Sequence, residues 1–157
     1  MNMQYFISYT KDAVGNNYLA INIERPIVEP YLEELESIIG DEYETFTNLQ
    51  QERDHNKHHI TVINVMEYNR LCKEIGMSKF ITSLDDFMKY PVTDLELLGI
   101  GTASKNNNTT YFVVCKSDKL KAIRDNYGLP NQDFHITLGF KNKDVFGVRK
   151  NIVLGKI

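Results

Sequence analysis

A short stretch that occurs twice constrains the fold of this chain more than any other feature: His59-Ile-Thr61-Val and His135-Ile-Thr137-Leu. In a β-strand successive side chains alternate between the two faces, so the histidine and the threonine of each copy point the same way. The isoleucine between them and the aliphatic residue that follows point to the opposite face. Each copy therefore predicts a strand with one apolar face and one face that carries an imidazole beside a hydroxyl.

The patterns around these two stretches predict an α+β protein. Runs rich in β-branched and aromatic residues predict strands over residues 4–9, 18–24, 43–50, 58–65, 94–103, 110–115 and 134–140. Apolar residues at helical spacing predict helices over residues 30–39, 68–75, 83–88 and 117–127. The polar residues 105–108 are typical of the turn of a hairpin.

The order of these elements predicts one domain with an internal duplication. At 157 residues the chain is long enough for a single domain, residues 1–157, with a substantial core. Each of two lobes, roughly 1–90 and 91–157, shows strand, helix, polar loop and then a His-Ile-Thr strand. If the lobes pack about a pseudo-twofold axis, the two His-Ile-Thr strands lie centrally and face one shared cleft.

Composition limits the partners of the protein. Hydrophobic content of 42% and charged content of 25% are typical of a soluble globular protein, and a net charge of −3 argues against long duplex nucleic acid. The two cysteines, Cys72 and Cys115, have no CxxC partner and predict reduced, buried thiols in a cytoplasmic protein. No stretch approaches the roughly 20 apolar residues of a membrane span, so no membrane partner is expected. The sequence leaves the oligomeric state open.

Two histidines and two hydroxyls suit phosphoryl transfer without a metal ion or other cofactor. A neutral imidazole takes a proton from the attacking oxygen, and a protonated imidazole gives one to the departing oxygen, both near neutral pH. The hydroxyls of Thr61 and Thr137 would donate hydrogen bonds to the non-bridging phosphoryl oxygens. His59 and His135 would then carry the two proton transfers.

The two stretches, the second within Phe134-His-Ile-Thr-Leu-Gly-Phe140, resemble the paired His-x-Thr/Ser motifs of the 2H phosphoesterase superfamily. The resemblance implies a two-lobed α+β fold with the four motif residues lining a central groove. It implies that His59 and His135 are the catalytic acid–base pair and that Thr61 and Thr137 bind the phosphate. It also implies hydrolysis of a nucleotide phosphodiester, with a 2′,3′-cyclic phosphate or an RNA end as the leading candidates.

Three alternatives stay open at this point. Some phage members of the superfamily cleave cyclic oligonucleotides that signal in bacterial defence. The resemblance therefore implies a nucleotide, a cyclic nucleotide or a short RNA as the partner. A binding module of the same shape would hold such a ligand without converting it. Both histidines would also be ordinary core residues if the repetition had no functional meaning.

Two neighbours of the motifs are candidate substrate-binding residues. Lys57, two positions before His59, would draw the phosphate in if the strand extends that far, although a solvated lysine at a strand end is the more ordinary explanation. Asp133 stands in the same relation to His135, and a nearby carboxylate favours imidazolium. This predicts His135 as the acid and His59 as the base.

Two other patterns receive simpler interpretations. Asp54, His55, His58 and His59 lie close in sequence, but their spacing matches no metal-site pattern, so no metal site is expected. Gly99-Ile-Gly101 lacks the third glycine of a dinucleotide-binding loop, and close packing or a β-bulge explains it better.

Overall fold

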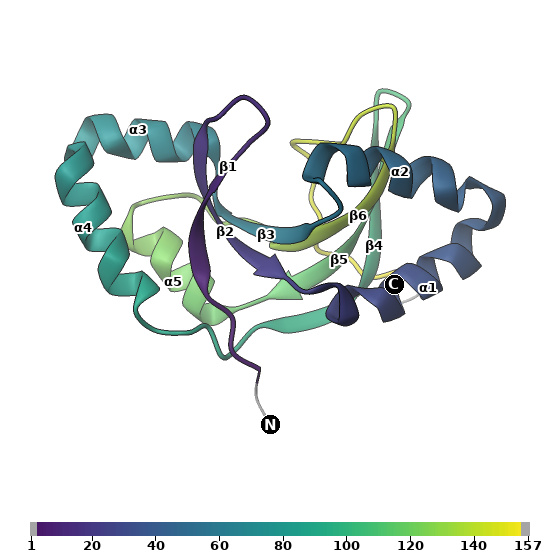
Figure 1. Cartoon of the computed structure of the whole chain (residues 1–157), viewed down its shortest axis with the longest axis horizontal. Helices are drawn as coiled ribbons and strands as arrows, with labels where there is room; N and C mark the ends of the chain where they lie inside the picture. Colours follow the sequence, from purple (N-terminus) through teal and green to yellow (C-terminus); the bar gives the residue numbers. More distant parts are fainter. Residues whose placement is uncertain (1–2, 155–157) are drawn as a thin grey trace. The chain divides into compact units, whose positions relative to one another are not determined.

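The computed structural model describes residues 3–154, which form a mixed α+β fold (Figure 1). The strands are β1 (Ile7–Lys11), β2 (Asn17–Ile23), β3 (His58–Ile63), β4 (Glu96–Lys105), β5 (Asn108–Lys116) and β6 (His135–Lys141). The helices are α1 (Arg25–Ile39), the 3₁₀ turn η1 (Gly40–Glu42), α2 (Tyr43–Asp54), α3 (Val65–Ile75), α4 (Met77–Met88) and α5 (Asp118–Asn126). The predicted α+β class is confirmed.

The chain divides into two compact units, each assembled from three separate stretches. Unit 1 comprises residues 3–22, 61–95 and 117–132, and unit 2 comprises residues 23–60, 96–116 and 133–154. We expected lobes that divide near residue 90, whereas both units take residues from both sides of that position. Each unit is described below by itself.

The strands of unit 2 pair antiparallel in the order β3-β6-β5-β4. Ile60 of β3 lies directly opposite Ile136 of β6, and both side chains are fully buried. Helix α2 packs on β6 at Gly139, where an added Cβ would lie only 2.9 Å from the backbone of Phe46. The missing side chain lets the helix approach the strand this closely, and the ring of Phe46 then packs edge-on against Tyr111 of β5.

The segment after β6, residues 142–154, is called the tail below, and part of it packs on β4. The amide of Leu154 donates to the carbonyl of Ile100 at 2.8 Å. An added Cβ at Gly101 would lie 2.7 Å from the carbonyl oxygen of Ile152, and one at Gly99 would lie 2.7 Å from Val153. The strand pairing also shifts by one residue between Leu97 and Gly99. The prediction of close packing or a bulge at the two glycines is confirmed.

Unit 1 is held together by a buried arginine. Arg124 of α5 is 3% exposed, and its guanidinium forms a two-pronged ion pair with Glu67 of α3 at 2.7–2.8 Å. It also donates to the carbonyls of Val62 and Pro130. Glu67 completes a capping box with Asn64 at the start of α3, so one carboxylate both caps α3 and binds α5.

Several predicted elements are confirmed. The strands around the two repeated stretches are β3 and β6, and the predicted hairpin is β4–β5, with Asn106 and Asn107 at positive φ in its turn. Helix α3 ends at Gly76, and the hydroxyl of Ser117 caps α5 by accepting from the amide of Leu120. Cys115 is buried and Cys72 is partly buried, and neither forms a disulfide.

Three element predictions are wrong. Residues 43–50 form helix α2, not a strand, because Phe46, Thr47 and Gln50 share the face that this helix buries. Helix α1 begins at Arg25, five residues earlier than predicted, with a proline in its first turn. Helix α4 begins at Met77, so Ser83 lies inside it and its hydroxyl donates to the carbonyl of Phe80.

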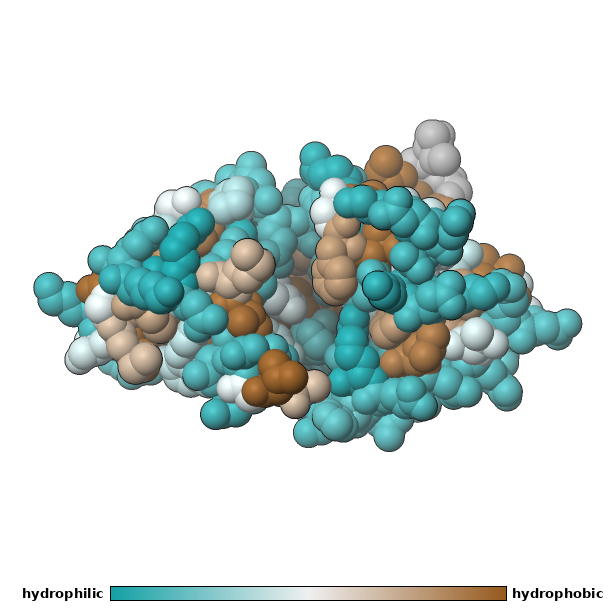
Figure 2. Space-filling view, turned by 90° about the horizontal axis from the view of Figure 1, so that it is seen from above, coloured by the Kyte–Doolittle hydropathy of each residue, from teal (hydrophilic) through white to brown (hydrophobic). Residues whose placement is uncertain are grey.

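The surface is mainly polar on the face drawn in Figure 2, where apolar residues form separate groups. Large apolar side chains with more than half of their area exposed include Phe6, Val14, Met66, Met77, Tyr90, Phe146 and Ile152. In residues 3–154 no helix combines the length and the apolar character that crossing a membrane requires.

Candidate active site

The pairing of β3 with β6 places both histidines on one face of the sheet. Because Ile60 and Ile136 are paired and point into the core, the residues that flank them point to the opposite face. His59, His135 and Thr137 are such residues and all belong to unit 2. The histidines are partly buried and Thr137 is 8% exposed, so this face is sheltered but not closed.

The ring of His135 is held from both nitrogens. Its Nδ1 lies 2.8 Å from the carbonyl oxygen of Asp133, which only accepts, so Nδ1 carries the proton and donates it. Its Nε2 lies 3.5 Å from Nζ of Lys150 in the tail. The ring also packs edge-on against Phe112, with 5.6 Å between centroids. These contacts fix the ring and leave Nε2 as the basic nitrogen.

The surroundings of His135 keep it neutral. Burial lowers the pKa of His135 to about 4, and the positive charge of Lys150 acts in the same direction. A proton on Nε2 would face the ammonium group of Lys150, which explains the effect of that residue. At neutral pH, His135 is therefore ready to accept a proton.

His59 lies among charges of both signs. Burial lowers its pKa and Arg53 adds to this effect, whereas the carboxylates of Asp54 and Asp144 oppose it. Acidic neighbours favour the protonated form of His59, and the negative charge of a bound anion would favour it further. The net effect is a pKa of His59 below its usual value, but the two carboxylates make His59 better suited than His135 to carry a proton once an anion is bound.

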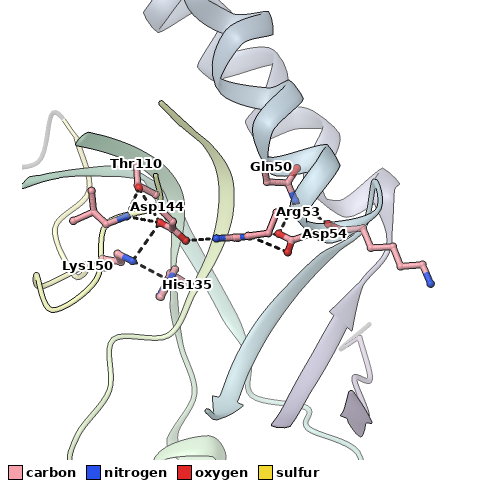
Figure 3. A network of polar contacts seen from close by, with 9 residues as sticks. Gln50, Arg53, Asp54, Thr110, His135, Asp144 and Lys150 are labelled. Atoms are coloured by element: carbon pink, nitrogen blue, oxygen red, sulfur yellow. Dashed lines mark hydrogen bonds and ion pairs between the residues drawn. The ribbon is translucent and has the colours of Figure 1, made fainter. Parts of the chain in front are cut away.

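Asp144 connects the tail to α2 (Figure 3). Its side chain is 6% exposed and forms an ion pair with Arg53, the residue before the last of α2. It also accepts from the hydroxyl of Thr110 at 2.8 Å and lies 3.9 Å from Nζ of Lys150. Burial raises the pKa of the Asp144 carboxyl. The contact with Arg53 outweighs this effect and holds that pKa below its usual value. Figure 3 shows Asp144 between the two cations, beside His135.

Comparison with known protein families gives a match over residues 17–146 to the 2H-SAK family, "Swiss Army Knife, 2H phosphoesterase domain". This match covers most of the chain and includes both His-Ile-Thr strands. The chain belongs to this 2H phosphoesterase family. It therefore has a phosphoesterase domain of the hydrolase class. Comparison with curated proteins and with solved structures gives no match.

Three of the four residues predicted as catalytic in this 2H phosphoesterase lie in unit 2: His59, His135 and Thr137. Thr61 begins a stretch of unit 1, where its carbonyl accepts from the side chain of Gln132 at 2.6 Å. The role of the Thr61 hydroxyl stays a prediction.

The two predicted substrate-binding residues of the 2H domain have other contacts. Lys57 precedes β3 and is exposed, and its carbonyl accepts from Gln50 at 2.8 Å. The carboxylate of Asp133 accepts from Arg149 at 2.7 and 3.1 Å and from the backbone amide of Lys150 at 2.9 Å. Substrate binding by either residue stays a prediction.

The contact between Asp133 and His135 differs from the one we predicted. The backbone carbonyl of Asp133 contacts the ring, while its carboxylate is bound to the tail. The pKa of His135 is lowered, the opposite of the shift that a carboxylate against the ring would produce. The assignment of His135 as the acid therefore loses its basis.

Asp54, His55, His58 and His59 are close in sequence but have different surroundings. Within residues 3–154 no three His, Cys, Asp or Glu side chains are grouped closely enough to hold a metal ion. His55 ends α2 in a left-handed conformation, and His58 is 3% exposed. The Nε2 atom of His58 has no hydrogen-bond partner among the described residues, so this ring faces the core.

The charged residues around His135 were not identified from the sequence. Arg53 lies beyond the strand predicted over residues 43–50, and helix α2, which holds it, was not predicted. Asp144 follows β6 in a stretch without any periodic pattern. Lys150 lies after the second motif, in a stretch for which no helix or strand was predicted. All of them come together through the tail, whose path the local sequence does not predict.

Proposed function

We propose that this 2H phosphoesterase is a metal-independent phosphodiesterase that hydrolyses a nucleotide phosphodiester, most directly a 2′,3′-cyclic phosphate or an RNA end. The observation that carries the proposal is the environment of the two motif histidines, which lie on one face of paired strands. One of them has a fixed tautomer and a basic Nε2, and the other lies beside two carboxylates.

In the proposed reaction His135 is the base and His59 is the acid. Nε2 of His135 takes a proton from the attacking water as the new O–P bond forms. His59 gives a proton to the ribose oxygen as its bond to phosphorus breaks. The hydroxyl of Thr137 donates to a non-bridging oxygen, where negative charge accumulates, and the same role for Thr61 stays a prediction. Proton exchange with solvent then restores neutral His135 and protonated His59.

This assignment reverses the one drawn from the sequence. A base must have a free lone pair at working pH, and the pKa of about 4 at His135 leaves its lone pair free. An acid must be protonated before the bond breaks, and the phosphate anion of a bound substrate adds to the effect of Asp54 and Asp144 on His59.

For the location of the protein, the cytoplasm stays our prediction.

The test is product analysis in the presence of EDTA. Wild type, His59→Ala and His135→Ala are each given a 2′,3′-cyclic mononucleotide, an RNA with a cyclic phosphate end and a panel of cyclic oligonucleotides. We expect turnover by wild type, unaffected by EDTA, and a loss of about 10²–10⁴-fold in each variant. His55→Ala is the matched control, because His55 lies outside both strands, and it should keep wild-type activity.

The substrate that is consumed decides between the alternatives. Cleavage of cyclic oligonucleotides alone would assign the protein to the destruction of a defence signal. Binding of one compound without turnover of any would make it a nucleotide-binding or RNA-end-binding module and would contradict the proposal. Loss of turnover in EDTA that added metal restores would contradict the metal-independent mechanism.

A further inference from the structure

The tail brings one cation and one exposed aromatic ring to His135. Nζ of Lys150 lies 3.5 Å from Nε2 of His135 and 5.6 Å from the centroid of the Phe146 ring. Phe146 is 71% exposed, whereas Lys150 is only 5% exposed. Lys150 also lies beyond the stretch that matches the family, residues 17–146. The family match therefore assigns it no role.

Among residues 3–154, the hydrogen-bond and ion-pair partners of the Lys150 ammonium group lie at long distances. The group lies 3.5 Å from the ring of His135 and 3.9 Å from the carboxylate of Asp144. A charge-assisted hydrogen bond is ordinarily about 2.7–2.9 Å long, so neither contact satisfies a buried cation well. Burial lowers the pKa of Lys150, and Asp144 counteracts that effect. A phosphoryl oxygen would be a better acceptor than either neighbour.

The position of Lys150 also matters for the acid–base step. In the free protein its N–H donates toward Nε2 of His135, the nitrogen that takes the proton in the proposed reaction. A phosphate group beside His135 would attract the ammonium to its own oxygen and would release Nε2 for the attacking water. The substrate would thus free the base by its own charge.

Phe146 suits the other end of a nucleotide. A large aromatic ring exposed to water gains free energy when a planar base stacks on it. The chain contains no tryptophan, so its large aromatic rings are those of Phe and Tyr. Lys150 lies within 6 Å of both the Phe146 and the Phe112 centroids, and Phe112 packs against His135. The ring of Phe146 therefore lies beside the same lysine that contacts His135, where the reacting phosphate would bind.

The tail is held firmly enough to position both residues. The carboxylate of Asp133 accepts from the backbone amide of Lys150 at 2.9 Å and from the side chain of Arg149. Past Lys150, the tail packs against Gly99 and Gly101 of β4 with no side chain between. Before it, Asp144 is bound to Arg53 and Thr110.

We propose that the tail forms a nucleotide subsite, in which Lys150 binds the phosphoryl oxygens of the substrate and Phe146 stacks on its base. The ligand class is a nucleoside phosphate or phosphodiester. This inference rests on the proposed function and adds to it the residues that hold the substrate.

The experiment is calorimetric titration with two probes, orthophosphate and adenosine 3′-monophosphate. Lys150→Met should bind both probes about tenfold or more weakly, because it loses a charge-assisted hydrogen bond. Phe146→Ala should bind the nucleotide about tenfold more weakly and orthophosphate as well as wild type does. Lys143→Met and Phe6→Leu, which change an exposed lysine of the tail and an exposed phenylalanine elsewhere, are the controls and should behave as wild type.

A second readout does not depend on the probes. In an NMR titration the pKa of His135 should rise in Lys150→Met, because a positive charge near Nε2 is removed, and should stay low in Lys150→Arg. Lys150→Arg also tests whether loss of binding comes from lost charge or from disturbed packing. It should keep most of the affinity for orthophosphate.

The outcomes separate this inference from the proposed function. Turnover by wild type with unchanged kcat/KM and probe affinity in Lys150→Met would overturn the subsite and leave the hydrolase intact. Probe binding that needs Lys150 and Phe146, without turnover of any substrate, would support the subsite and overturn the hydrolase. Failure of wild type to bind adenosine 3′-monophosphate at millimolar concentration, or equal binding by all variants, would contradict the subsite.

Discussion

His59 and His135 occupy the same position in two nearly identical stretches, yet their surroundings differ. His135 is held by a backbone carbonyl on Nδ1, by Lys150 at Nε2 and by the ring of Phe112. The charges that act on His59 are Arg53, Asp54 and Asp144. The pKa of His135 is therefore lowered further by a lysine, whereas two carboxylates oppose the lowering of the pKa of His59.

The difference shows that a symmetric pair of motifs does not require symmetric chemistry. The residues that set the two histidines apart lie outside the motifs: Arg53 and Asp54 at the end of α2, and Asp144 and Lys150 in the tail. A reaction that needs one proton acceptor and one proton donor requires such an asymmetry. The motifs supply the imidazoles, and their neighbours assign the roles.

The largest effect is expected from a substrate whose leaving group needs no proton. On thymidine 3′-(4-nitrophenyl phosphate), His59→Ala should recover most of the activity that it loses on a 2′,3′-cyclic nucleotide, about 10²–10⁴-fold. His135→Ala should stay inactive on both substrates, because the attacking water still needs a base. Initial rates on the two substrates check this.

The opposite pattern would contradict the roles proposed for the two histidines. Recovery by His135→Ala, with His59→Ala inactive, would restore the assignment first made from the sequence. Equal losses on both substrates would mean that neither histidine acts mainly as the acid.

The next effect concerns Asp144, the carboxylate that acts on both histidines. Asp144→Asn leaves the charge of the partly buried Arg53 without one of its two carboxylate partners. We expect a loss of about 2–3 kcal/mol in the free energy of unfolding, measured with urea at pH 7. Asp86→Asn, at an exposed ion pair with Lys89, is the control and should cost less than about 1 kcal/mol.

The same variant should change how stability depends on acid. The pKa of the Asp144 carboxyl is held below its usual value, so its contribution is present above the unfolded pKa of 3.8 and is lost as pH falls through the lower folded value. Asp144→Asn should lose less stability than wild type below pH 4. Parallel curves for the two proteins there would contradict the role of the ion pair.

The smallest effect is expected at His58, which adjoins His59 but faces the core. Burial lowers the pKa of His58 to about 4, so the unfolded chain binds a proton near pH 6.5 that the folded chain does not. Its contribution to stability therefore falls as pH decreases from about 6.5 to 4. His58→Met should be about 1–2 kcal/mol less sensitive to this change, measured by urea unfolding at pH 7 and pH 5.

His58→Met should keep the pH–rate profile of wild type, because the variant changes the apolar side of the strand. A profile that moves together with this substitution would mean that His58 takes part in the proton transfers. In that case three histidines, and not two, would take part in the reaction.

Most of the elements that carry the motifs follow from local patterns in the sequence. The alternation in His59-Ile-Thr61 and His135-Ile-Thr137 predicts β3 and β6, and the asparagines at 106 and 107 predict the β4–β5 turn. These signals act over a few residues, which is why they can be recognised without the fold.

Helix α2 was missed because local preference and tertiary packing disagree. Tyr43, Phe46 and the threonines at 45 and 47 favour a strand by propensity. The helix forms because it places Phe46 over Gly139 and against Tyr111, contacts across more than sixty residues of sequence. Because α2 was not predicted, the position of Arg53 was not predicted either. Its contact with Asp144 joins residues 91 positions apart, which local patterns do not predict.

The interleaved make-up of unit 2 has a consequence for synthesis on the ribosome. Ile60 of β3 is fully buried only when β6 lies beside it, and Lys150 follows His59 by about ninety residues. At about 5–20 residues per second, the apolar side of β3 waits roughly 5–20 s for its partner strand and tail. During that interval the nascent chain carries an unpaired hydrophobic strand, so the rate of translation and the supply of chaperones should decide the yield of active protein.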